Sequence, residues 1–110
     1  MNARFLVKPK ADQDLDDHSD YLAKKASLDV ALRFLVAARE TFSLLATQPQ
    51  MGWRARLNHP RLKSLRVFRV AGFERMPILY RPLPEGIEIL RVVHGSRNIE
   101  ALFRRREEVE

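Results

Sequence analysis

Hydrophobic residues at the start of the chain predict a strand followed by a helix. The short apolar run inside Arg4–Lys8 predicts the strand, and Pro9 closes it because proline cannot donate a ladder hydrogen bond. Asp12 then provides an N-cap for a helix over about Asp12–Ala26, which has aspartates in its first turns and Lys24 near its end, as the helix dipole favours. Its apolar stripe is weak, which predicts a surface helix.

A stronger helical pattern follows after Ser27, which can cap it. Apolar residues then recur at three- and four-residue steps, which predicts one buried face. This face consists of Leu28, Ala31, Leu32, Leu35, Ala38, Phe42 and Leu45. Pro49 ends the helix, because the residue before a proline is pushed out of the helical region. The short connection to the preceding helix predicts an antiparallel helical hairpin.

The second half of the chain has the composition of strands. After a loop over Gln50–Lys63, which has no clear period, three extended segments follow. These are rich in Val, Ile, Leu, Phe and Tyr and span Ser64–Val70, Met76–Pro82 and Gly86–His94. The short connections between them imply an antiparallel meander, and the third is apolar on both faces, as in a central strand. A final short helix is expected at about Asn98–Arg105.

This order predicts an α+β fold. The chain reads β-α-α-β-β-β: an N-terminal strand, an antiparallel helical hairpin packed on a small, mainly antiparallel sheet, and a short C-terminal helix. With 110 residues, positions 1–110 are expected to form a single domain. The chain has no cysteine, so apolar packing must hold the fold. No segment is typical of a membrane span or an export signal, and a cytoplasmic protein is expected.

Charge distinguishes the two halves of the chain, whose net charge is +6. From Met1 to Met51, seven Lys and Arg stand against seven Asp and Glu, whereas from Gly52 to Glu110 thirteen stand against seven. The whole excess of positive charge therefore lies in the second half. This half is expected to attract an acidic partner.

Several polar side chains could carry chemistry or bind a target. RNA cleavage needs a general base, a general acid and cations near the phosphate. The residues able to supply these are His94, Tyr80, Arg66, Arg81, Arg91 and Arg97. The imidazole has an ordinary pKa of about 6.5, which suits proton transfer. Structural roles are the simpler interpretation: a histidine bonded to the turn backbone and a tyrosine in the core.

Other basic and aromatic residues also have two interpretations. Arginines that alternate with apolar residues along the strands can line one face as a phosphate-binding patch or can be ordinary solvated residues. They are Arg66, Arg69, Arg81 and Arg91. Trp53 with Arg54 and Arg56 can grip single-stranded nucleic acid, or the tryptophan can pin its loop to the hairpin.

Metal and cofactor chemistry has little support in the sequence. The three histidines, His18, His59 and His94, are far apart along the chain and have no cysteine or carboxylate at ligand spacing. A glycine-rich phosphate loop and a Ser-His-Asp signature are also missing from the sequence. We therefore expect no metal and no cofactor.

The order of elements, together with the run Arg91–Asn98 after Ile87–Leu90, resembles the ParE/RelE toxin superfamily. The resemblance spans nearly the whole chain, and the turn His94–Arg97 is more similar to the ParE side. Supporting segments are Asp14–Leu15, Tyr21–Leu22, Ala31–Phe34, Pro49 with Gly52, Leu65–Val67 and Ile78–Arg81. The resemblance implies a toxin of a type II toxin-antitoxin system, neutralised by a cognate acidic antitoxin in a hetero-oligomer.

The resemblance leaves two activities open. ParE-like members block DNA gyrase by binding, whereas RelE-like members cut mRNA on the ribosome. RelE-like nucleases are similar in having a lysine- or glutamate-rich helix or loop and a tyrosine close to the C-terminus. After Phe103, this chain has only Arg104–Arg106, Val109 and acidic residues. This favours a ParE-like gyrase inhibitor, with a RelE-like endoribonuclease as the alternative and an RNA-binding module without toxicity as the third hypothesis.

Each activity assigns its own residues. Binding of the target is expected at His94, Arg97, Arg104, Arg105 and Arg106. Binding of the antitoxin is expected at Leu22, Leu32, Leu35, Arg66, Arg69 and Arg91. A nuclease would instead use His94, Arg66, Arg81, Arg97 and Tyr80.

Overall fold

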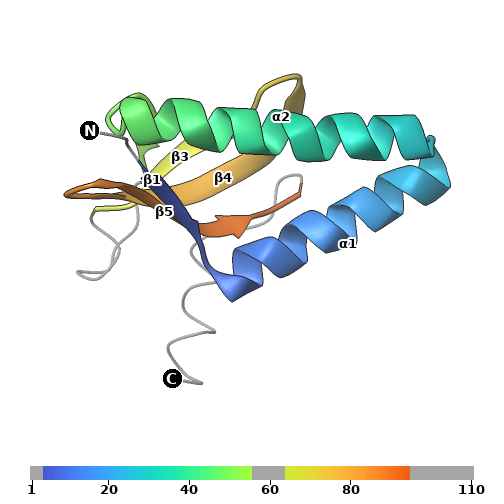
Figure 1. Cartoon of the computed structure of the whole chain (residues 1–110), viewed down its shortest axis with the longest axis horizontal. Helices are drawn as coiled ribbons and strands as arrows, with labels where there is room; N and C mark the ends of the chain where they lie inside the picture. The colour runs from blue at the N-terminus through green and yellow to red at the C-terminus, as the bar shows by residue number, and fades with distance from the viewer. Residues whose placement is uncertain (1–3, 56–63, 95–110) are drawn as a thin grey trace.

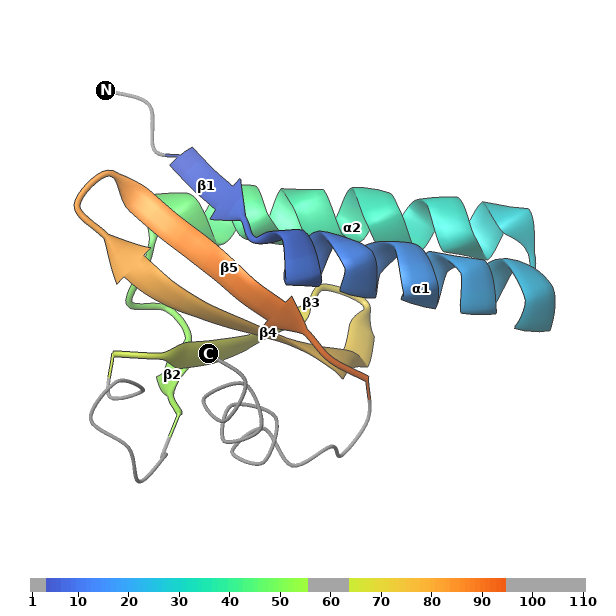
Figure 2. The ribbon, with the colours of Figure 1, turned by 90° about the horizontal axis from the view of Figure 1, so that it is seen from below.

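The computed structural model describes residues 4–55 and 64–94. A pair of antiparallel helices packs on one face of a five-stranded sheet (Figures 1 and 2). The elements are β1 (Arg4–Val7), α1 (Pro9–Lys25), α2 (Leu28–Thr47), β2 (Trp53–Arg54), β3 (Arg66–Val70), β4 (Phe73–Leu83) and β5 (Gly86–Val92). The predicted α+β fold is confirmed. Neither helix is long and apolar enough to cross a membrane.

The strand order is β1-β5-β4-β3-β2, and every neighbouring pair is antiparallel except β1 with β5. The apolar strand β5 therefore lies between two neighbours, as its composition predicts. The meander is also confirmed, with a tight turn at Gly72, whose φ of 80° favours glycine. The expected helix Asn98–Arg105 and the target-binding candidates Arg97 and Arg104–Arg106 lie outside the described residues.

One of the two helices begins at a different residue from the one predicted. Helix α1 begins at Pro9 and not at Asp12, with Lys8 in the N-cap position. Proline is tolerated there because the first N–H groups of a helix have no intrahelical acceptor. Asp12 lies in the first turn, so its predicted role as N-cap is wrong. The predicted cap of α2 is confirmed: the Ser27 hydroxyl accepts a hydrogen bond from the Val30 N–H at 3.1 Å.

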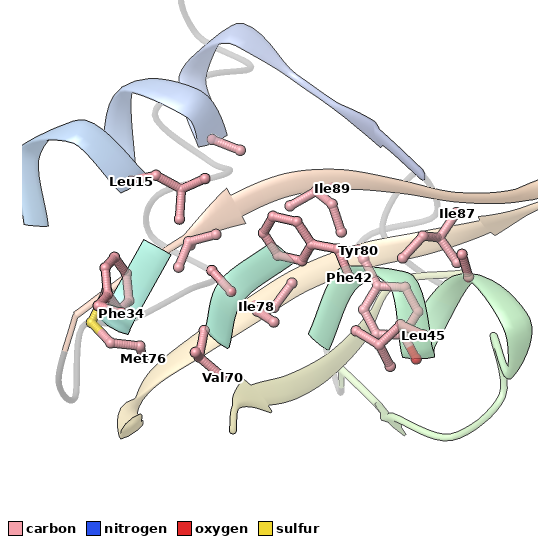
Figure 3. Close-up of a cluster of buried hydrophobic side chains, with 14 residues drawn as sticks. Leu15, Phe34, Phe42, Leu45, Val70, Met76, Ile78, Tyr80, Ile87 and Ile89 are labelled. Carbon is pink, nitrogen blue, oxygen red and sulfur yellow. The ribbon is translucent and has the colours of Figure 1, made fainter. Parts of the chain in front are cut away.

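The buried face of α2 is rotated relative to the prediction. Leu28 and Leu32 are 66% and 53% exposed, whereas Phe34 and Phe42 are fully buried against the sheet (Figure 3). Two apolar stripes run along this helix, and the sheet covers the one with the two large aromatic rings. Burial of an aromatic ring removes more apolar area from water than burial of a leucine, so this rotation is favoured. The second stripe stays on the surface.

The strand boundaries also differ. Strand β4 begins at Phe73 instead of Met76, and β5 ends at Val92, which leaves His94 beyond the strand. The expected loop contains β2, whose two residues pair with β3 through Trp53 and Val67. A strand this short has no measurable period, so the sequence pattern could not reveal it.

Candidate functional site

Tyr80 lies in the core and holds the end of α2 against the sheet. Its hydroxyl donates to the Pro49 carbonyl at 2.8 Å and accepts from the Gly52 N–H at 2.9 Å. The Arg66 guanidinium donates to the Gly52 carbonyl at 2.6 Å. We call these four residues the Tyr80 latch. The structural interpretation of Tyr80 is confirmed, and its hydroxyl already has both partners.

Burial raises the pKa of Tyr80 above its ordinary value of 10.0, although the hydrogen bond from Gly52 and the charge of Arg66 act in the opposite direction. The phenol is therefore neutral at neutral pH. A general acid benefits from a pKa near the operating pH. The environment of Tyr80 moves its pKa away from that range.

Arg91 is buried in an ion pair between the sheet and α1. Its guanidinium donates to both carboxylate oxygens of Asp14, at 2.7 and 3.0 Å, and the side chain is almost fully buried. The same carboxylate accepts the Val92 N–H at 3.0 Å. Strand β1 ends before this point, so Asp14 supplies the acceptor that the edge of β5 would otherwise lack. Arg91, one of the residues expected to bind the antitoxin, is thus almost fully buried in an ion pair within the chain.

The other strand arginines do not converge on one face. Residues alternate between the faces of a strand, so Arg66 and Arg69 lie on opposite sides of β3. Arg81 forms a 2.7 Å ion pair with Glu88 on the neighbouring strand. Arg69 lies over the ring of Trp53, 5.0 Å from its centroid. The expected phosphate-binding patch is therefore not formed by these four arginines.

His94 lies beside His18 of α1, with ring centroids 5.0 Å apart. His18 also packs against Phe34 at 4.9 Å and Tyr21 at 5.7 Å. The rings of His18, Tyr21 and His94 border a cavity of about 290 Å³, which we call the histidine pocket. It is lined by Asp14, Asp17, His18, Tyr21, Met76, Arg91, Val92, Val93 and His94. His18 and His94 are far apart along the chain, and no local sequence pattern signals that they meet.

The environment of His18 favours its neutral form. Burial lowers its pKa below the ordinary value of 6.5, and the neighbouring His94 lowers it further. A buried imidazolium loses hydration, and a second one nearby would add repulsion. His18 is therefore an uncharged imidazole at neutral pH. A neutral imidazole has a free nitrogen lone pair, which can accept a proton or bind a metal.

An apolar depression of about 480 Å³ lies between α2 and the turn that joins β3 to β4. We call it the α2 groove. It is lined by Leu32, Arg33, Val36, Ala37, Glu40, Gly72 and Phe73. Leu32 and Val36 belong to the apolar stripe that the sheet does not cover. Of the leucines expected to bind the antitoxin, Leu22 and Leu35 are half-buried against the core, and Leu32 is exposed.

Comparison with known proteins gives one family and one fold. Residues 5–99 match the family described as "ParE toxin of type II toxin-antitoxin system, parDE". The solved structure described as "Chromosomal ParDE TA system from P. aeruginosa" matches with a TM-score of 0.70 and 19% sequence identity, over 86% of this chain and 97% of that chain. At this identity the likeness shows a shared fold. No curated protein sequence matches significantly.

Proposed function

The chain belongs to the ParE toxin family of type II toxin-antitoxin systems, and we propose that it blocks DNA gyrase by binding and is neutralised by a cognate antitoxin. One observation carries the proposal: the polar side chains suited to catalysis have structural partners, whereas apolar side chains of α2 remain on the surface. Such a surface suits binding to another protein. A catalytic site would instead require polar side chains that are free to contact a substrate.

The α2 groove is the proposed anchor for the antitoxin. Leu32 and Val36 lie four residues apart, one turn of the helix, and Phe73 adds an aromatic side chain from β4. Exposed apolar side chains in a groove of this kind accept the apolar face of a partner helix. The net charge of +6 would speed the approach of an acidic partner. Of the expected antitoxin-binding residues, Leu32 is therefore the one we place at the centre of this contact.

The alternative, a RelE-like endoribonuclease, is not favoured. Tyr80 is buried, and the guanidinium groups of Arg66 and Arg91 have partners within the fold. Arg81 is paired with the carboxylate of Glu88, which offsets the positive charge that would bind an RNA phosphate. A nuclease would have to break these contacts before its side chains could reach RNA. We assign His94 to target binding and not to proton transfer.

Expression of the chain without its antitoxin tests the proposed target. We expect induction of the SOS response and double-strand breaks in cells, and inhibition of supercoiling by purified gyrase. The variant His94→Ala should weaken gyrase binding without changing any RNA. Truncated mRNA with normal gyrase activity would instead support the nuclease and would overturn the proposal.

The antitoxin anchor can be tested separately, by titration of the antitoxin into the toxin in a calorimeter. Leu32→Glu should weaken binding at least tenfold, because it places a charge in the apolar groove. Leu44→Glu is the matched control, since Leu44 is also an exposed leucine of α2 but does not line the groove. Equal weakening by the two variants would show that the groove has no special role.

A further inference from the structure

Two imidazoles from different elements meet at the histidine pocket. His18 comes from the middle of α1, and His94 follows the end of β5, with their ring centroids 5.0 Å apart. We propose that His18 and His94 bind one divalent transition-metal cation of the zinc class between their imidazoles. This proposal does not rest on the proposed action on gyrase, although His94 is also a proposed target-binding residue. The two residues are far apart along the chain and are brought together by the fold.

The distance between the rings fits this role. A zinc ion bonds imidazole nitrogen at about 2.1 Å, and two imidazoles on one tetrahedral zinc have centroids about 5 Å apart. The 5.0 Å between the centroids of His18 and His94 is therefore compatible with one cation shared by the two imidazoles.

The charges around the pocket also favour a cation. Asp14 and Arg91 neutralise each other in their ion pair, so the carboxylate of Asp17 gives the pocket wall a net negative charge. Asp17 accepts a hydrogen bond from the neutral amide of Gln13 at 2.8 Å, which leaves its charge in place. A divalent cation is therefore attracted by Asp17, and the positive charge of Arg91 is already paired with Asp14.

The ligand set determines which metals can bind. In residues 4–55 and 64–94, no cluster of three or more metal-ligating side chains is present. Two imidazoles alone leave coordination positions for water, as in exchangeable sites rather than the closed four-ligand sites of structural zinc. Imidazole suits Zn²⁺, Ni²⁺ and Cu²⁺, whereas Mg²⁺ and Ca²⁺ prefer oxygen ligands. Binding of Zn²⁺ or Ni²⁺, but not Mg²⁺, is therefore the signature of this site.

A bound metal would join α1 to the end of β5. Because the unfolded chain holds these histidines far apart, a cation bound by both stabilises only the folded protein. Addition of zinc should therefore raise the melting temperature. The same link would restrain His94, which is also a proposed target-binding residue.

The experiment uses the full chain without a tag and without a partner protein. Calorimetry measures the binding of ZnCl₂, NiCl₂ and MgCl₂, and thermal unfolding measures the effect of each salt on the melting temperature. We expect Zn²⁺ and Ni²⁺ to bind with one ion per chain and to raise the melting temperature. Nitrogen-15 NMR should show that both His18 and His94 shift on addition of Zn²⁺. His18→Phe and His94→Phe should each weaken Zn²⁺ binding at least tenfold.

Phenylalanine is chosen because it keeps an aromatic ring against Phe34 and Tyr21 while it removes the nitrogen ligands. Circular dichroism of the metal-free variants verifies that they fold. His59→Ala is the control, since it removes the third histidine and should leave Zn²⁺ binding unchanged. Loss of binding in His59→Ala, binding of Mg²⁺ as strong as that of Zn²⁺, or undiminished binding in either phenylalanine variant would overturn the proposal.

Discussion

The inner face of the sheet and the outer face of α2 use opposite kinds of side chain. On the inner face, Tyr80, Arg66 and Arg91 form hydrogen bonds to the backbone or to a carboxylate. Among the described residues, no buried side-chain nitrogen or oxygen lacks a partner. On the outer face, Leu32 and Val36 are more than half exposed.

This difference separates the side chains that stabilise the fold from those proposed to bind the antitoxin. Buried polar groups are costly unless their hydrogen bonds are made, so the polar residues of the inner face are committed to the fold. Exposed apolar groups gain free energy when a partner covers them. The residues with the most reactive side chains therefore have structural roles, and the least reactive ones form the proposed protein contact.

The largest effect on stability is expected for Asp14→Ala. It leaves the Arg91 guanidinium buried without its partner and also removes the acceptor of the Val92 N–H. Loss of one partner of a buried ion pair costs about 3–5 kcal/mol, which urea denaturation can measure. The double variant Asp14→Leu with Arg91→Met should recover much of this loss. A destabilisation of Asp14→Ala below about 1 kcal/mol would contradict the structural role of the pair.

A smaller effect is expected for Tyr80→Phe. This change keeps the ring but leaves the Gly52 N–H and the Pro49 carbonyl without their partner. Unsatisfied buried groups cost about 1–3 kcal/mol, again measured by urea denaturation. Tyr21→Phe, at the second tyrosine of the chain, is the control, because Tyr21 is exposed and should tolerate the loss of its hydroxyl. Equal stability of the two variants would show that the latch contributes nothing.

The pH dependence of the free energy of unfolding should reveal the protonation of His18. Its pKa is lower in the folded protein than the ordinary value of 6.5, so the unfolded chain takes up a proton first as the pH falls. The contribution of His18 is therefore complete above pH 6.5 and decreases as the pH falls from 6.5 toward the folded pKa. Denaturation of metal-free protein above and below pH 6.5 measures it. His18→Phe should reduce this pH dependence, and an unchanged dependence would assign it to other groups.

The smallest effect on stability is expected on the outer face of α2. Val36→Asp changes an exposed side chain that supports no buried contact, so the free energy of unfolding should change by no more than about 0.5 kcal/mol. Antitoxin affinity should nevertheless fall, as for Leu32→Glu. If Val36→Asp destabilises the chain as much as Tyr80→Phe, the α2 groove belongs to the core and the contrast between the two faces is wrong.

Much of the fold follows from local patterns. The period of α2, its Ser27 cap and the turn at Gly72 are encoded within a few residues, and the structure agrees with them. The rotation of α2 was not predictable in the same way. Both of its stripes are apolar, and only the competition for the sheet surface decides that Phe34 is covered and Leu32 is not.

The candidate site depended even more on the tertiary structure. The sequence by itself determined the α+β order, the excess of positive charge and the similarity to ParE toxins, because period, composition and motif order are properties of the chain. Only the folded structure decided that Arg91 pairs with Asp14 and that His18 meets His94. Contacts between residues far apart in the chain depend on how α1 and β5 pack, and no local pattern records that packing.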